Sequence, residues 1–307
     1  MFEFINFLRA FATILITNSH YEVVYPIQAL GTGGLLGNSI FFIVSGFCLA
    51  NGVKRGFVSW FSKRITRIYP ACFIATIFGI VIGRFEIGGI YDFVASFIYP
   101  TKFGFIGTII LLYIPYYFVV NYFFTNNRSV KLYMCLLVFF NLGVFLTSLY
   151  TKQDYFIKVY YFDLMLSGVF LKKYKIDADK HFGIYSVALV GLYYVIEILK
   201  KKVLLPYFVI LLNYGVLLLA TVCIFQWAKS KEAFFKNIDS SVVRKIIGFL
   251  STHTLEIYII QVVILRYTPN VAFPINAIVL TGEILIGAMV LHICCDKMIK
   301  MVVRRND

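Results

Sequence analysis

Two residues near the start of the chain have side chains that could do chemistry within an apolar segment. Arg9 lies inside the run FINFLRAFATILITNSH, and His20 ends it. A separation of eleven residues is about three helical turns, so both side chains are expected on one helix face, roughly 16 Å apart. Such a pair could stabilise a developing negative charge and accept a proton. Alternatively, Arg9 extends to the lipid headgroups and His20 is an interfacial polar residue.

A second candidate lies in the basic and aromatic stretch KRGFVSWFSKRITRIYP. Arg64 and Arg67 are one helical turn apart, so their guanidinium groups can converge on one anion. We expect this stretch to form the first cytoplasmic loop. Basic residues beside a membrane span are also common orientation signals, which is the alternative interpretation.

Other ionisable residues fall in or beside apolar runs, namely Asp163, Glu197, Glu256, Glu283, His253 and His292. His253 and Glu256 are three residues apart and share a helix face. These groups could line a substrate path or relay a proton, or they could form ion pairs that hold helices together. The six cysteines show no metal-binding spacing and are expected to pack as small apolar residues, so we predict no metal site and no bound cofactor.

The elements that position these residues are expected to be membrane helices. Apolar residues make up 60% of the chain and charged residues only 14%, too few for a water-exposed surface of this size. We predict an all-α integral membrane protein, a polytopic bundle of about ten transmembrane helices that forms one domain over residues 1–307 with no appended soluble domain. The expected spans are 4–20, 34–53, 68–83, 103–124, 131–150, 159–171, 182–198, 203–227, 246–265 and 275–295, with 91–100 as a candidate re-entrant segment.

The distribution of basic residues predicts the orientation. If both termini are cytoplasmic, twenty of the 29 lysines and arginines lie on the cytoplasmic side, eight lie outside, and Arg9 lies within a span. The positive-inside rule favours this arrangement. The net charge of +14 then indicates contact with anionic lipid headgroups, and no nucleic-acid partner is expected.

Four short motifs occur in order along the chain. They are Arg9 with His20, the FFxxSG signature at Phe41, Phe42, Ser45 and Gly46, the RxxRIYP element at Arg64 to Pro70, and GFLSTHTLEIYIIQ from Gly248 to Gln261. Together they resemble the bacterial membrane acyltransferase-3 family, sugar O-acetyltransferases that modify O-antigens, capsules, peptidoglycan and Nod factors. The joint match is far more specific than any one motif.

The resemblance implies an enzyme of the bacterial inner membrane, a multi-pass O-acyltransferase that uses cytoplasmic acyl-CoA, most simply acetyl-CoA, as donor. The acceptor would be a hydroxyl of a surface polysaccharide or a lipid-linked glycan. We expect His20 and Arg9 to be catalytic, and Arg64, Arg67 and Ser45 to bind the donor, whose phosphates suit arginine side chains.

Two departures from the family pattern limit what can be carried over. Gln261 stands where the family commonly has a histidine, so no catalytic role is assigned there. The expected central span, 103–124, lacks the tryptophan and glutamate often found in the family, which leaves the acceptor site open.

Two other classes of protein remain as alternatives. A polysaccharide flippase or transporter would also place arginine, histidine and carboxylates within a helix bundle. Against it, the chain shows no inverted internal repeat. A glycan polymerase would be expected to carry a long outer loop, and no such loop is evident.

Overall fold

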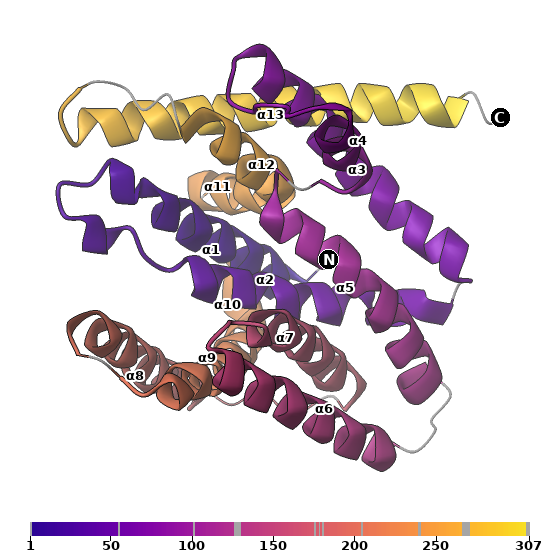
Figure 1. Cartoon of the computed structure of the whole chain (residues 1–307), viewed down its shortest axis with the longest axis vertical. Coiled ribbons are helices and arrows are strands. Elements are labelled where there is room, and N and C mark those ends of the chain that lie inside the picture. The colour runs from indigo at the N-terminus through magenta and orange to yellow at the C-terminus, as the bar shows by residue number, and fades with distance from the viewer. Residues whose placement is uncertain are drawn as a thin grey trace. The chain divides into compact units, whose positions relative to one another are not determined.

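A computed structural model of the chain describes residues 2–54, 56–100, 102–125, 130–174, 176–177, 179, 181–203, 205–238, 241–265 and 271–304. In these ranges every regular element is a helix (Figure 1). The order is α1 (Glu3–Ser19), η1 (His20–Val23), η2 (Gln28–Leu30), α2 (Gly34–Leu49), η3 (Ala50–Lys54), α3 (Phe57–Val81), α4 (Ile90–Ile98), α5 (Gly104–Val119), η4 (Val120–Thr125), α6 (Val130–Thr151), α7 (Phe156–Lys173), α8 (Phe182–Lys202), α9 (Tyr207–Ser230), α10 (Glu232–Lys236), α11 (Ser241–Thr252), α12 (Thr254–Ile264) and α13 (Ile275–Arg304).

The helices confirm an all-α membrane protein. Among the described residues, seven helices are long and apolar enough to cross a membrane, or eight if the bent pair of α11 and α12 counts as one span. The number ten is not confirmed, although each expected span coincides with a helix or with that bent pair. With 17 residues, α1 falls short of the roughly 20 that cross a bilayer directly, and α7 contains Lys158 and Asp163.

Two boundaries differ from the sequence-based expectation. Arg64 and Arg67 lie inside α3, which begins at Phe57, and not in a loop. The expected single span 246–265 is broken at His253, where α11 and α12 meet at 71°. Several basic residues used to predict the orientation lie outside the described residues, namely Arg55, Arg128, Lys175, Lys180, Arg266 and Arg305.

The chain divides into two compact units, each built from separate segments. Unit 1 comprises Met1–Arg9, Asn38–Gly56 and Ile114–Ser241. Unit 2 comprises Ala10–Gly37, Phe57–Tyr113 and Val242–Asp307. Helix α1 contributes its first turns to unit 1 and the remainder to unit 2.

In unit 1, close approach of α2 and α7 is the main packing feature. A Cβ atom on Gly46 would clash with the carbonyl of Met165, and one on Gly168 would clash with the carbonyl of Ile43. Only glycine therefore allows these two backbones to approach so closely. The hydroxyl of Tyr116 donates a hydrogen bond of 2.8 Å to the Gly46 carbonyl and ties α5 to the same crossing.

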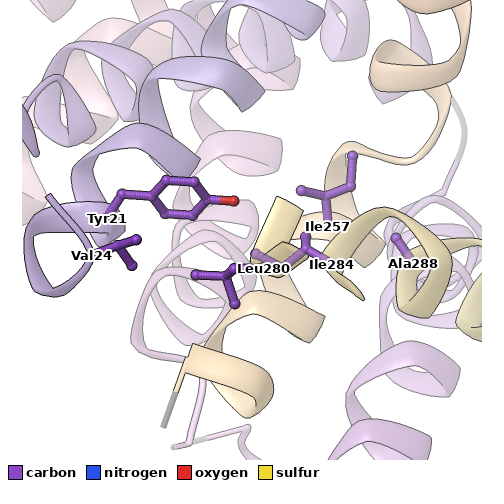
Figure 2. Packing of buried hydrophobic residues seen from close by; sticks show 6 residues of the cluster. All are labelled: Tyr21, Val24, Ile257, Leu280, Ile284 and Ala288. Atoms are coloured by element: carbon purple, nitrogen blue, oxygen red, sulfur yellow. The ribbon is translucent and has the colours of Figure 1, made fainter. Parts of the chain in front are cut away.

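In unit 2, α12 packs against α13, and α3 packs against both. Figure 2 shows the apolar cluster that links this group to the segment after α1. Its buried members are Tyr21, Val24, Ile257, Leu280, Ile284 and Ala288. Because residues of η1 and α13 bury their side chains together here, the chain next to His20 has a fixed position within unit 2.

Candidate active site

His20 is the first residue of η1, just beyond the end of α1. The next residue, Tyr21, is buried, and its hydroxyl lies 2.8 Å from the hydroxyl of Thr281 on α13. The side-chain amide of Asn276 donates to the carbonyl of Val24, which fixes the end of the segment. Burial lowers the pKa of His20 below its ordinary value of 6.5, and the nearby carboxylate of Glu22 opposes this shift. The shift favours the neutral imidazole, the form that can accept a proton.

Arg9 lies in the middle of α1 and is half-buried. The α-helical geometry used to place Arg9 and His20 on one face extends to Ser19, one residue short of His20. Their shared face remains a prediction. Arg9 closes the first segment of unit 1, whereas His20 belongs to unit 2.

The two arginines of the RxxR element have different partners within unit 2. Arg64 donates from Nη1 to the backbone carbonyl of Trp60 at 3.3 Å, and its guanidinium carbon lies 4.8 Å from the centre of the Trp60 ring. Arg67 instead forms an ion pair with Glu256 on α12, with 2.8 Å between Nη1 and Oε1. Arg64 is thus stacked on its own helix, while Arg67 links α3 to α12.

The Arg67 ion pair joins an exposed cation to a buried anion. The side chain of Arg67 is 41% exposed, and that of Glu256 is 0% exposed. A guanidinium carries five N–H donors, so Arg67 can bind Glu256 and still present donors to an anion in solution. The arrangement is suited to recognising phosphate from the exposed side.

Glu256 has a second partner in His292 of α13. The imidazole Nδ1 of His292 lies 3.0 Å from Glu256 Oε1, and its Nε2 lies 3.6 Å from Asp296 Oδ2. The ring of His253 lies 4.6 Å from the ring of His292. Among the described residues, Glu256 Oε2 has no hydrogen-bond partner, so this buried carboxylate is held through one oxygen.

Glu256 and His292 are residues that the sequence left outside the expected site. The three-residue spacing of His253 and Glu256 indicated one shared helix face, but it did not show that Arg67 and His292 meet the same carboxylate. Within the described part of the chain, these groups do not form a metal-binding set. The cluster is therefore an ion-pair network around one donor-site candidate, Arg67.

Ser45 and Gly46 occupy the α2 side of the crossing with α7. Ser45 is half-buried, and its expected role in donor binding remains a prediction. The neighbouring Gly46 has a structural role, since any larger residue would separate α2 from α7.

Gln261 is fully buried on α12, at the position where the family commonly has histidine. Neither polar atom of its side-chain amide has a hydrogen-bond partner among the described residues. A buried amide without partners costs free energy, so this position carries an uncompensated polar group.

A cavity of about 680 Å³ opens beside η1 in unit 2. Its lining surface is mainly apolar, from residues such as Phe249 and Ile284, while Tyr21, Tyr25, Asn18, Lys245 and three threonines add polar groups. The Tyr25 hydroxyl donates to the Asn18 side chain at 2.7 Å, which holds both residues in the wall. The cavity has the size and the lining of a site for an amphipathic molecule.

Comparison with known proteins agrees with the motifs. A family model described as an acyltransferase domain, Acyl_transf_3, matches residues 2–295. Neither the curated proteins nor the solved structures gave a match. Because the family match covers nearly the whole chain, the resemblance drawn from the four motifs is confirmed, and the activity that accompanies it is acyl transfer to a hydroxyl of a glycan-like acceptor. The chain belongs to the acyltransferase-3 family and is a multi-pass membrane acyltransferase.

Proposed function

We propose that this protein transfers an acetyl group from cytoplasmic acetyl-CoA to a hydroxyl of a surface polysaccharide or lipid-linked glycan. It acts in the bacterial inner membrane, as the family resemblance implies, and the distribution of basic residues predicts that both termini are cytoplasmic. His20 is the base, Arg9 supplies positive charge along the path of the thioester arm, and Arg64, Arg67 and Ser45 bind the donor.

The chemistry requires one proton acceptor and one cation. His20 takes the proton of the acceptor hydroxyl, and the oxygen attacks the thioester carbonyl carbon. Negative charge then develops on the carbonyl oxygen, which a cation or a hydrogen-bond donor stabilises. The carbon–sulfur bond breaks, coenzyme A leaves as the thiolate, and the proton held by the imidazole returns to the medium. The lowered pKa of His20 supports this role because it favours the neutral imidazole, the form that accepts a proton.

The main support for the proposal is the orientation and exposure of the Arg67 side chain. Its guanidinium is oriented by the buried carboxylate of Glu256 while 41% of its side chain stays exposed. Coenzyme A brings a diphosphate and a phosphate monoester, which planar guanidinium groups bind through paired hydrogen bonds. An oriented, accessible arginine in the family's RxxR element is therefore suited to bind the donor.

The cavity beside Tyr21 supports an acceptor that carries a lipid. It adjoins the segment that begins with His20, and its lining is mainly apolar with hydroxyl and amide groups from Tyr21, Tyr25 and Asn18. A lipid-linked glycan has the matching combination of an apolar chain and a polar headgroup.

The test is replacement of His20 by alanine, followed by mass spectrometry of the acetyl groups on the cell-surface glycans. We expect O-acetylation to be lost while the protein is present in the membrane at normal amounts. Normal acetylation with His20→Ala would refute the assignment. Transfer or hydrolysis of the acetyl group of acetyl-CoA by the purified protein separates an enzyme from a flippase or a polymerase.

A further inference from the structure

A second cavity, in unit 1, is surrounded by lysines. It has a volume of about 270 Å³ and lies where η3, η4 and the end of α7 meet. Lys54, Lys172, Lys173 and Asn51 contribute polar groups to its lining. A space below the roughly 300–1,000 Å³ of typical small-molecule pockets suits a single charged group or the end of a larger molecule.

The segments that form this cavity contain no carboxylate. The sequence has no aspartate or glutamate between Glu22 and Glu86, between Asp92 and Asp154, or between Asp163 and Asp177. All residues that line the cavity lie within these three stretches. In the described part of the chain, neither Lys54 nor Lys172 lies within ion-pair distance of a carboxylate.

The ammonium group of Lys172 caps the C-terminal end of α2. Lys172 donates from Nζ to the carbonyl of Phe47 at 2.9 Å, and its ammonium lies 4.9 Å from the centre of the Phe47 ring. The C-termini of α2 and α7 each carry the equivalent of about half a negative charge. The lysines that line the cavity therefore carry more positive charge than the two helix ends offset.

We infer that this cavity, defined by Asn51, Lys54, Lys172 and Lys173, is a binding site for a phosphate monoester. A phosphate monoester carries about 1.5 to 2 negative charges at pH 7, which suits a lining that is positive and has no carboxylate. Lys172 uses one of its three N–H donors on Phe47, so two remain, and the Asn51 amide adds two donors. The phosphate comes either from coenzyme A, through its 3′-phosphate, or from an anionic lipid headgroup. The site does not depend on the acyl transfer proposed above.

The first arm of the experiment measures binding of coenzyme A and of dephospho-coenzyme A to the purified full-length protein by titration calorimetry. The second arm measures retention of phosphatidate relative to phosphatidylcholine in bilayer discs. The test variant is Lys54→Gln/Lys173→Gln. The control is Lys300→Gln, which removes one charge from α13 and leaves the cavity intact.

If the phosphate belongs to coenzyme A, the native protein should bind coenzyme A roughly tenfold more tightly than dephospho-coenzyme A, because a hydrogen bond to a charged group contributes about 1.5–3 kcal/mol. The double variant should lose this preference. If it belongs to a lipid, the double variant loses its preference for phosphatidate. Binding equal to that of Lys300→Gln in both arms would overturn the inference. Lys54→Glu, a single change at an exposed residue, repeats the test should the double variant unfold.

Discussion

Arg67 and Glu256 form a 2.8 Å ion pair although 189 residues separate them in the sequence. The pair connects α3 to α12, and His292 of α13 binds the same carboxylate oxygen at 3.0 Å. Three helices of unit 2 thus meet at one buried charge. Arg67 has two tasks as a result, since it neutralises Glu256 inside the helix packing and presents donors to solution.

Removal of Arg67 should destabilise the protein through Glu256. In Arg67→Met the carboxylate is buried without its cation, which costs about 3 kcal/mol of unfolding free energy. Adding Glu256→Gln removes the buried charge, so the double variant should recover most of this loss. Thermal unfolding in detergent measures both effects, with Lys63→Met as a matched change on the same helix. A double variant less stable than Arg67→Met would contradict this interpretation of the pair.

Replacement of Arg67 by lysine should weaken donor binding while the charge is kept. Lysine cannot form the paired hydrogen bonds of a guanidinium, so we expect the KM for acetyl-CoA to rise about tenfold with little change in kcat. Steady-state kinetics at saturating acceptor gives both constants. Lys63→Arg, an exchange of the same two residue types on α3, should leave the KM within about twofold. An unchanged KM in Arg67→Lys would exclude a bidentate contact with the donor.

The dependence of the rate on pH should follow the protonation of the His20 imidazole. The base acts in its neutral form, so the rate falls as the pH decreases through the pKa of the imidazole. Burial lowers that pKa, so the midpoint of the acid limb should lie below 6.5. Replacement of Glu22 by glutamine removes the opposing carboxylate and should move the midpoint further down. A midpoint above 6.5 in the profile of kcat/KM would contradict this role.

Substitution of Gly46 should affect folding before it affects chemistry. In Gly46→Ala the new methyl group meets the Met165 carbonyl, so α2 and α7 must separate, and we expect a loss of about 2–3 kcal/mol. Gly191→Ala is the control, because a Cβ atom there meets nothing within 4 Å. Alanine is also the better helix former, so this control should be neutral or stabilised by up to about 1 kcal/mol. Equal stability of the two variants would show that α2 and α7 can accommodate a methyl group at Gly46 without separating.

The helices could be predicted from the sequence more completely than the contacts between them. Long apolar runs indicate each membrane helix, but the charged residues before Ile68 suggest solvent and therefore predict a loop. Helix α3 in fact begins at Phe57 and carries both arginines. The break at His253 had no glycine or proline to indicate it, so one span was expected where two short helices meet.

The sequence predicts which residues belong to the site, but it does not predict which of them contact one another. The four motifs identified His20, Arg9, Arg64, Arg67 and Ser45 because their order is specific to the family. In the sequence, Glu256 and His292 are two of several ion-pair candidates, because only tertiary packing brings them to Arg67. The catalytic roles of His20 and Arg9 stay predictions, and His20→Ala is their direct test.

The alternation of segments between the two units has a consequence for biosynthesis. Each unit draws on three separate stretches, and unit 2 receives its last stretch only from Val242 onward. At the usual 5 to 20 residues per second, the ribosome needs roughly 10–40 s after adding Arg67 to reach Glu256, its counter-ion 189 residues away. During that interval Arg67 lacks the carboxylate of Glu256, so a nascent chain halted before α12 should be a preferred substrate for membrane proteases.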